Sequence, residues 1–342
     1  TNYETVRNGK LDPNHFEVAS LDEAAILRGF GGTKTFRQMM ALFAGDDRSG
    51  ARTRGVPFRY VATATPSPNE YIELLAYAAY LDVMDVSAAK TRFFKRDAVK
   101  ADNLTLHPHK EEEFWQWVAS WAVAMRKPSD LGFSDERYIL PSLNLFHHSV
   151  KNEENLVVDG QIQLFNQIAR RLTEVRSEQR LTTTKRCEKA VDLVDGHDCS
   201  VYWCNFNQEG DLIAEMDKEA RQISGSMDLD KKEEILLAFA SGQISRLITK
   251  PKITAFGLNW QHCAHTVFFP TFSYEQYYQA IRRFWRFGQT RPVTVDLVYS
   301  DGQQRVMDSL LAKAEKASEL FAKLNASINS SYHQSVKEFS KP

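Results

Sequence analysis

Short apolar runs alternate along much of the chain with longer segments in which apolar residues recur at helical spacing. The apolar runs are typical of buried strands, and they lie at residues 16–20, 58–64, 200–206, 246–249 and 293–299. Helical periodicity predicts helices at residues 69–79, 161–180, 182–194, 231–241 and 303–328. Strands that alternate with helices form parallel sheets with helices on both faces. The pattern therefore predicts an α/β fold.

Three helical segments carry clear apolar stripes. Residues 111–125 place Phe114, Trp117, Val118, Trp121 and Met125 on one side, which indicates core packing. In residues 231–241 the inward residues are expected to be Ile235, Leu236 and Phe239. The stripe of residues 303–328 predicts a helix that braces the body, with a partner-binding helix as the alternative.

The segment 274–293 holds the densest candidate chemistry. If residues 274–287 are helical and end at Gly288, then Gln276, Gln279, Arg283 and Arg286 share one stripe. Guanidinium groups are planar donor forks that stay charged, so two of them one turn apart suit a phosphoryl group in transfer. The alternative is a solvated basic face.

An acidic pair, Asp22 and Glu23, follows the first predicted strand, where parallel sheets place their ligands. Such a pair also occurs for structural reasons alone. The sequence TATPSPN at residues 63–69 comes after the second strand, and its two prolines delay the next helix until Asn69. Residues 31–35, GGTKT, lack the Gly, four residues, Gly-Lys-Ser/Thr spacing of a phosphate loop, and that spacing occurs nowhere in this sequence.

The arginine segment, QAIRRFWRFGQ, resembles motif VI of the Swi/Snf group of superfamily-two helicases. Residues 249–260, TKPKITAFGLNW, are similar to motif V, although Thr254, Ala255 and Phe256 replace the usual residues before Gly257. TATPSPN resembles motif III and LDEAA, at residues 21–25, resembles motif II. The resemblance covers nearly the whole chain, most weakly at residues 86–150, and favours bacterial or phage members.

This resemblance implies two RecA-like lobes, the first partial and the second complete, plus a helical insertion. The expected divisions are residues 1–85 for the first lobe, 86–150 for the insertion and linker, 151–302 for the second lobe and 303–342 for the bracing helix and tail. The lysine-bearing phosphate loop would come from a segment that this sequence does not contain, in the same chain or in another polypeptide.

The resemblance also implies ATP and magnesium as cofactors, with hydrolysis in the cleft between the lobes. Asp22 would bind the metal, and Glu23, the other member of the metal site, would orient the attacking water. Arg286 would be the arginine finger and Arg283 its partner. The nucleotide would be contacted by Asp22, Gly257, Asn259 and Gln289, and Thr63 and Thr65 would couple nucleotide state to lobe movement.

DNA is the partner that the resemblance implies, held by its backbone without sequence specificity. The expected DNA-binding residues are Asn205, Ser224, Thr249, Lys250, Lys252, Trp260 and Gln279. Two other classes of function stay open. The chain could be a DNA-binding subunit of a nuclease or defence complex that does not hydrolyse ATP, or a structural adaptor derived from a helicase, although the intact acidic and arginine motifs disfavour the adaptor.

Composition adds few constraints. The formal net charge of −1 excludes a globally basic protein, yet residues 246–292 hold seven Lys and Arg residues against Glu275 alone. The four cysteines form no CxxC pair and their spacing fits no usual zinc site, which predicts free thiols in a reducing compartment. The absence of a long apolar run predicts a soluble, cytoplasmic protein with no membrane partner.

Overall fold

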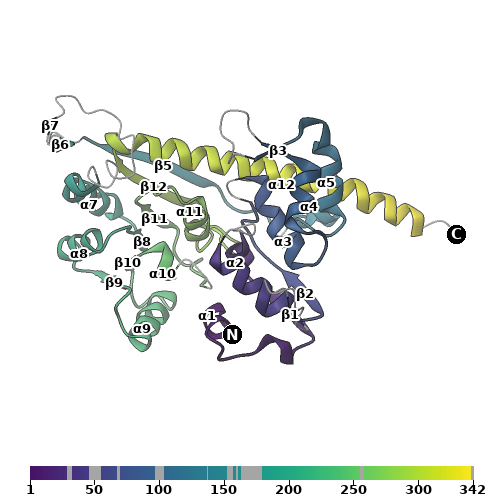
Figure 1. The fold of residues 1–342 in the computed structure, drawn as a ribbon. Helices are drawn as coiled ribbons and strands as arrows, with labels where there is room; N and C mark the ends of the chain where they lie inside the picture. The colour runs from purple at the N-terminus through teal and green to yellow at the C-terminus, as the bar shows by residue number, and fades with distance from the viewer. Residues whose placement is uncertain are drawn as a thin grey trace. The chain divides into compact units, whose positions relative to one another are not determined.

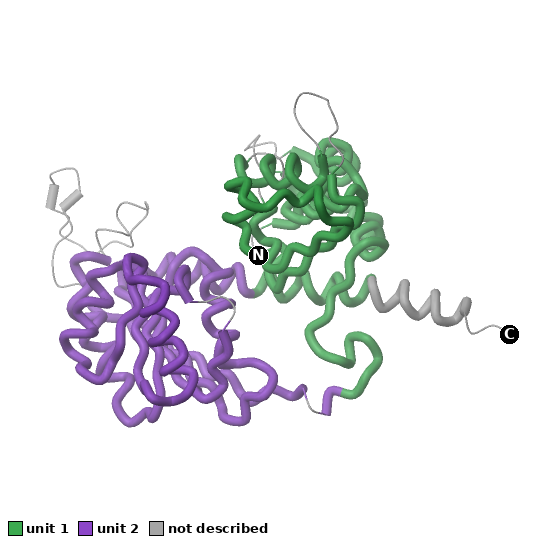
Figure 2. Tube along the Cα trace, turned by 90° about the horizontal axis from the view of Figure 1, so that it is seen from below, with its two compact units in different colours: residues 1–134, 315–342 green, residues 135–314 purple. Residues whose placement is uncertain are grey.

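The computed structural model describes residues 1–28, 33–45, 55–67, 70–96, 104–136, 138–151, 157–158, 161–162, 179–254 and 258–339. The chain divides into two compact units (Figure 2). Unit 1 comprises Thr1–Ser134 and Glu315–Pro342, and unit 2 comprises Asp135–Ala314. Each unit is described by itself.

Unit 2 is built on a six-stranded sheet in which every neighbouring pair is parallel (Figure 1). The strands, in spatial order, are β5 (Leu143–Val150), β12 (Val293–Ser300), β11 (His265–Phe268), β8 (Ser200–Trp203), β10 (Arg246–Thr249) and β9 (Ala220–Gln222). The helices of this unit are α7 (Thr183–Val194), α8 (Asn207–Met216), α9 (Leu229–Ala240), α10 (Pro251–Thr254), α11 (Tyr274–Ile281) and the start of α12 (Gln304–Phe339). A separate antiparallel pair consists of β6 (Val157–Val158) and β7 (Gln161–Ile162).

Alternate strand residues feed two different cores, one on each face of this sheet. On one face Trp203 and Leu247 pack with residues of α9 and α11 and with the first turns of α12. On the other face Tyr202 and Ile248 pack with residues of α7 and α8. Because successive side chains of a strand point to opposite faces, a continuous apolar run serves both cores. The predicted α/β fold, a parallel sheet with helices on both faces, is confirmed.

Unit 1 contains a parallel pair, β1 (Val18–Leu21) and β2 (Phe58–Val61), and an antiparallel pair, β3 (Phe94–Arg96) and β4 (Leu104–Leu106). Its helices are α1 (Tyr3–Arg7), α2 (Lys34–Met39), α3 (Leu74–Tyr80), α4 (Val86–Phe93), α5 (Glu111–Ala119) and the part of α12 from Glu315 onward. A π-helical turn, Met40–Ala44, follows α2, and 3-10 turns lie at Pro13–His15, Ala24–Leu27, Tyr71–Glu73, Pro108–Lys110 and Pro128–Leu131, with one more in unit 2 at Asp301–Gln303. The core includes Leu21, Leu75, Phe93 and Phe114.

Most predicted elements appear with small shifts at their ends. The stripe of residues 111–125 packs as expected at Phe114 and Val118, but the helix ends at Ala119 and Met125 is exposed. Residues 231–241 present Phe239 to the core, with Ile235 and Leu236 packed against it. Asn69 and most of the predicted helix at 161–180 lie outside the described residues.

Two features of the chain's division differ from the sequence prediction. Residues 143–150, expected in a linker, form β5, which pairs with β12 along its whole length and therefore belongs to unit 2. The helix α12 contributes Leu310 to the core of unit 2 and Leu320 and Leu324 to the core of unit 1.

None of the helices in the described part of the chain has the length and apolar content needed to cross a lipid bilayer.

Candidate functional site

The acidic pair of unit 1 lies where β1 ends. Asp22 is exposed and Glu23 is half-buried. The Tyr3 hydroxyl donates a hydrogen bond to the Asp22 carbonyl, and the Glu23 amide donates to Asp22 Oδ1 at 3.0 Å. Burial raises the pKa of Tyr3 to about 12, and the nearby carboxylates act in the same direction. Tyr3 therefore stays a neutral donor that fixes the backbone beneath the pair.

Glu23 occupies the left-handed region of backbone conformation, with φ 50° and ψ 48°. The conformation is held from both sides, because the Ala24 amide donates to the Ala62 carbonyl at 2.9 Å and the Ala62 amide donates to the Leu21 carbonyl at 2.8 Å. A residue other than glycine pays an energetic penalty there, and such strain concentrates at functional sites. The conformation turns the chain sharply after Asp22.

The two threonines of the TATPSPN segment behave differently. Thr63 is half-buried, and its hydroxyl oxygen accepts a hydrogen bond from the Thr65 amide at 3.2 Å. Thr65 is only 4% exposed, and its hydroxyl has no hydrogen-bond partner among the described residues. A buried hydroxyl without a partner costs free energy, and it is a group that a change in the surrounding structure could satisfy.

In unit 2, five of the predicted DNA-binding residues follow the carboxyl ends of three neighbouring strands. These residues are Asn205 after β8, Ser224 after β9, and Thr249, Lys250 and Lys252 at the end of β10. Lys252 is exposed, whereas the Lys250 ammonium donates to Asn207 Oδ1 at 2.6 Å. The Ser224 hydroxyl is 3.3 Å from that of Ser226. The tertiary structure thus gathers two lysines and a serine pair at one edge.

Two residues at this edge make hydrogen bonds within the protein through their side chains. Thr249 is 1% exposed and its hydroxyl accepts a hydrogen bond from that of Thr254 at 3.1 Å. The Asn205 side-chain amide donates to the carbonyls of Phe269 and Pro270, at 3.0 and 3.3 Å. Burial of the Thr249 side chain does not fit direct DNA contact by its hydroxyl, whereas Asn205 is half-buried and its DNA contact stays a prediction.

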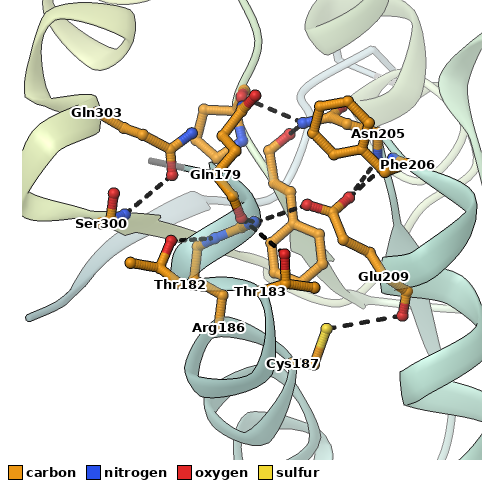
Figure 3. Close-up of polar contacts among 12 residues, drawn as sticks. Gln179, Thr182, Thr183, Arg186, Cys187, Asn205, Phe206, Glu209, Ser300 and Gln303 are labelled. Atoms are coloured by element: carbon orange, nitrogen blue, oxygen red, sulfur yellow. Dashed lines mark hydrogen bonds and ion pairs between the residues drawn. The ribbon is translucent and has the colours of Figure 1, made fainter. Parts of the chain in front are cut away.

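A buried ion pair contacts the turn between β8 and α8, which contains Asn205 and Phe206 (Figure 3). Arg186 of α7 and Glu209 of α8 are both fully buried, with Arg186 Nη1 2.7 Å from Glu209 Oε1. The other carboxylate oxygen of Glu209 accepts hydrogen bonds from the amides of Asn205 and Phe206, at 2.7 and 3.0 Å. Each charge is thus paired and hydrogen-bonded, as a buried charge requires.

The guanidinium of Arg186 uses its remaining donors nearby. Nη2 donates to the Gln179 carbonyl at 2.6 Å, and Nε donates to the Thr182 hydroxyl at 3.2 Å. The same group lies 5.0 Å from the centre of the Phe269 ring. Arg186 therefore connects α7, the β8–α8 turn and the end of β11 into one rigid corner.

The arginine segment departs from the predicted geometry. Helix α11 ends at Ile281, and residues 282–288 form successive tight turns, so Arg283 and Arg286 do not share a helical face. The predicted helix to residue 287 is therefore wrong. The cause is tertiary: the Arg283 carbonyl accepts a hydrogen bond from the Trp260 amide at 2.9 Å, which removes it from the helical ladder.

The arginines of this segment have different environments. Arg283 is 5% exposed and its guanidinium donates to the Leu258 carbonyl. The Arg282 guanidinium lies 5.2 Å from the centre of the Tyr278 ring and 4.6 Å from that of the Trp285 ring, so Arg282 is packed between side chains of its own segment. Arg286 is half-buried, and its side chain has no partner among the described residues.

Three residues predicted to bind ligands are buried in unit 2. Trp260 is fully buried and stacks on Trp203, with ring centres 5.7 Å apart. Gln279 is 4% exposed. Gln289 is 6% exposed, and its amide donates to the carbonyls of Gln261, Cys263 and Phe284. Direct DNA contact by Trp260 and Gln279 and nucleotide contact by Gln289 do not fit this burial. Trp260 and Gln289 instead support the surrounding structure through this stacking and these hydrogen bonds.

The other predicted nucleotide contacts are divided between described and undescribed residues. Asn259 is exposed beside the arginine segment, where Leu258 and Trp260 are both bonded to Arg283. Gly257 lies outside the described residues. Segments 258–263 and 282–291 are thus held together by several hydrogen bonds and form a platform that contains Arg286.

Comparison with known families gives one match, which lies in unit 2. Residues 182–288 match the Helicase conserved C-terminal domain. This part of the chain is therefore similar to the carboxyl-terminal domain of helicases. The match begins at α7 and ends just after Arg286, so it contains the Arg186–Glu209 pair, the strand ends and the arginine segment.

Solved structures give weaker likenesses. The crystal structure of the C-terminal part of the Fun30 ATPase domain is 14% identical, with a TM-score of 0.34 over 41% of this chain and 54% of that chain. A variant of S. cerevisiae Dbp5 bound to RNA and ADP BeF3 is 10% identical, with a TM-score of 0.46 over 95% of this chain and 66% of that chain. This chain thus spans between about half and two thirds of the length of these structures. A search of curated proteins finds no match.

Sequence reasoning missed the Arg186–Glu209 pair and Asn207. Glu209 stands three residues after Phe206 at the start of a helix, a spacing typical of a capping glutamate, so this signal was present. Nothing in the sequence pointed to Arg186, because its partner is 23 residues away and an arginine in an amphipathic helix is ordinarily solvated.

Proposed function

We propose that this chain is part of an ATP-dependent DNA translocase or helicase of the Swi/Snf-like, bacterial or phage type. The observation that carries the proposal is Arg286. A half-buried guanidinium without a side-chain partner among the described residues, on a platform held by Trp260, Arg283 and Gln289, is suited to an anion that arrives from outside. The match of the surrounding residues to a helicase domain supports a phosphoryl group as that anion.

The acidic pair of unit 1 suits magnesium. The described residues hold no cluster of three or more metal-ligating side chains. Magnesium needs no such cluster, since it keeps several waters and takes one or two carboxylates together with substrate phosphates. In the proposal Asp22 is the metal ligand and Glu23 orients the attacking water. The bound ion would neutralise charge on the phosphates.

DNA binding is assigned to the strand-end edge of unit 2. Lys252, Lys250, Ser224 and Asn205 are the contacts that remain after the buried residues are set aside. Lysines bind phosphates as point charges and release counterions, which gives affinity without a base code. The proposal therefore expects backbone binding that weakens as salt is added.

The phosphate loop is assigned to a further segment, in the same chain or in another polypeptide. In the parallel pair β1–β2, Val18, Phe58 and Tyr60 are each more than half exposed. Parallel strands are ordinarily covered on both faces, so a two-stranded parallel pair with an exposed apolar face suits an additional strand or helix. The sequence pattern of a phosphate loop is absent from the chain itself.

The missing phosphate-loop pattern also favours a second candidate function, a DNA-binding subunit of a nuclease or defence complex that does not hydrolyse ATP. An ATPase experiment distinguishes the two candidates. We expect the chain alone to bind DNA but not to hydrolyse ATP, and sustained DNA-stimulated phosphate release by the purified chain would contradict this expectation. If adding a polypeptide with the phosphate loop never restores hydrolysis, the second candidate is favoured.

Arg286 is tested in the protein supplied with that polypeptide. We expect Arg286→Ala to lower turnover roughly a thousand-fold or more with little change in nucleotide binding, because the charge acts on the transferring phosphoryl group. Arg286→Lys should restore little, since it lacks the planar fork. Arg221→Ala, at an exposed arginine of β9, is the matched control and should be near normal. Near-normal turnover of Arg286→Ala would refute the assignment.

A further inference from the structure

Two cysteines meet at the amino-terminal edge of the sheet in unit 2. Cys199 directly precedes β8, and Cys263 lies two residues before β11. These strands are hydrogen-bonded neighbours in which Ser200 pairs with His265. Cys199 is half-buried and Cys263 is fully buried. The parallel register therefore brings a partly accessible thiol and an inaccessible thiol to the same place.

The side chains around Cys199 are those that favour a thiolate. Cys199 packs against the core cluster that contains Cys263, and the Cys263 thiol donates to the His265 carbonyl at 3.4 Å. His262 and Arg291 are close enough to act on the charge of Cys199. The Arg291 side chain is held there by its hydrogen bond to the His262 carbonyl. Contact with Cys263 is the largest cause that lowers the pKa of Cys199 to about 6, His262 and Arg291 act in the same direction, and burial opposes them.

The other three cysteines differ. Burial raises the pKa of Cys263, of Cys204 and of Cys187, the last to about 12. A thiolate is the nucleophile in cysteine chemistry, and low pKa together with access makes a cysteine reactive. Cys199, whose pKa is lowered, thus lies near Cys263, whose pKa is raised, and the other two cysteines of the unit, Cys187 and Cys204, also have raised pKa values.

We propose that Cys199 and Cys263 are a redox-active pair that forms a reversible disulfide when the protein meets a peroxide. The Cys199 thiolate attacks one peroxide oxygen and the O–O bond breaks, which gives a sulfenic acid and hydroxide. Cys263 then loses its proton to that hydroxide as its sulfur attacks the sulfur of Cys199, and a second hydroxide leaves and is protonated by solvent. In total, two thiols and hydrogen peroxide give one disulfide and two waters.

The geometry permits this bond. The register that pairs Ser200 with His265 leaves Cys263 one residue out of line with Cys199. With strands about 4.8 Å apart and a rise of about 3.3 Å per residue, this diagonal is about 6 Å, inside the range of roughly 4.4–6.8 Å between Cα atoms that a disulfide spans. Bond formation requires the Cys263 thiol to leave the His265 carbonyl, to which it donates at 3.4 Å.

The pair is connected to the arginine segment through Gln289. The Cys263 carbonyl accepts a hydrogen bond from Gln289 at 3.1 Å, and the same amide group donates to the carbonyls of Gln261 and Phe284. A disulfide at Cys263 would thus strain the platform that contains Arg286. This consequence for turnover rests on the proposed function, whereas the chemistry of the pair does not.

The test uses the whole purified chain and hydrogen peroxide. We expect iodoacetamide to alkylate Cys199 first, with a rate that rises through a midpoint near pH 6, while Cys187, Cys204 and Cys263 react only on unfolding. After treatment with peroxide, mass spectrometry should find a Cys199–Cys263 cross-link, with loss of two hydrogen atoms, that dithiothreitol reverses. Cys263→Ser should instead stop at a sulfenic acid on Cys199 that dimedone traps.

Two results would overturn the proposal. One is a Cys199 alkylation midpoint near that of a free cysteine, about 8.5, in a protein whose circular dichroism is normal. The other is a Cys263→Ser chain that forms no dimedone adduct at Cys199 and a wild-type chain that forms no cross-link. Neither measurement uses ATP or DNA, so failure here is distinct from failure of the proposed function.

Discussion

Replacing Arg186 by methionine tests whether the buried ion pair holds the strand-end corner of unit 2. Methionine keeps most of the aliphatic stem but removes the guanidinium, and with it the hydrogen bonds to Glu209, Gln179 and Thr182. The Glu209 carboxylate stays fully buried and retains only the two amide donors of the β8–α8 turn.

The expected loss can be worked from these contacts. The bond to the Glu209 carboxylate is charge-assisted on both sides and contributes roughly 1.5–3 kcal/mol, and the other two contribute about 1 kcal/mol each. The sum is about 3.5–5 kcal/mol, which agrees with the roughly 3–5 kcal/mol that follows removal of one partner from a buried pair. We therefore expect Arg186→Met to lower the free energy of unfolding of unit 2 by about 3–5 kcal/mol.

A double-mutant cycle with Glu209→Gln isolates the coupling between the two charges. Glutamine can still accept from the two amides, but its NH₂ group cannot pair with the guanidinium. The single change should therefore be about as costly as Arg186→Met. Residues in direct contact couple by roughly 0.5–3 kcal/mol, and for this pair we expect about 2–3 kcal/mol, so the double variant should be less destabilised than the sum.

Native-state hydrogen exchange in increasing urea is the appropriate assay, because one global unfolding free energy is poorly defined for a chain of two units. Amides of Tyr202 and Trp203 report on unit 2, and that of Ser20 in β1 should be unaffected. Lys189→Met, on the same helix, is the matched control and should change stability by less than about 0.5 kcal/mol. A loss below about 1 kcal/mol for Arg186→Met, or strictly additive effects, would refute the reasoning.

Three further predictions concern other parts of the chain. Glu23→Gly should stabilise unit 1 by up to about 1 kcal/mol, because glycine accepts the left-handed conformation. The same change should abolish ATP turnover in the protein supplied with the phosphate loop. Lower stability in unfolding measurements, or retained turnover in ATPase measurements, would contradict the prediction. Burial alone would raise the pKa of Asp296, but hydrogen bonds from His265 and His148 hold that pKa below its usual range. The stability that the Asp296 carboxylate contributes is therefore present above about pH 3.9 and is lost as pH falls through the pKa of the folded protein. Asp296→Asn should flatten the acid limb of a stability–pH curve, and an unchanged limb would count against these two hydrogen bonds. Lys252→Ala should reduce the slope of DNA affinity against salt by about one unit, whereas Lys218→Ala, before β9 at the opposite edge of the sheet, should leave it unchanged, as fluorescence anisotropy can measure.

The candidate site was only partly predictable, and its residues show why. The acidic pair and the lysines after β10 follow apolar strands, and because parallel strands end at one edge, their positions come from local pattern alone. The burial of Trp260, Gln279 and Gln289 cannot be predicted from local pattern, because residues distant in the sequence cover them. For a polar or aromatic residue in a loop, the sequence alone predicts exposure to solvent, and only the tertiary structure shows which residues cover it.

By itself, the sequence determined the α/β class and located the strands β1, β2, β8, β10 and β12 and the helices α3, α5, α7, α9 and α12, because hydrophobic periodicity records which face of each element is buried. Tertiary structure decided where the helix before the arginines ends, through the bond from Trp260 to the Arg283 carbonyl. It also decided that Arg186 pairs with Glu209 and that Cys199 packs against the cluster that contains Cys263. These pairings depend on hydrogen bonds and register between distant segments, for which a local pattern of polar and apolar residues contains no information.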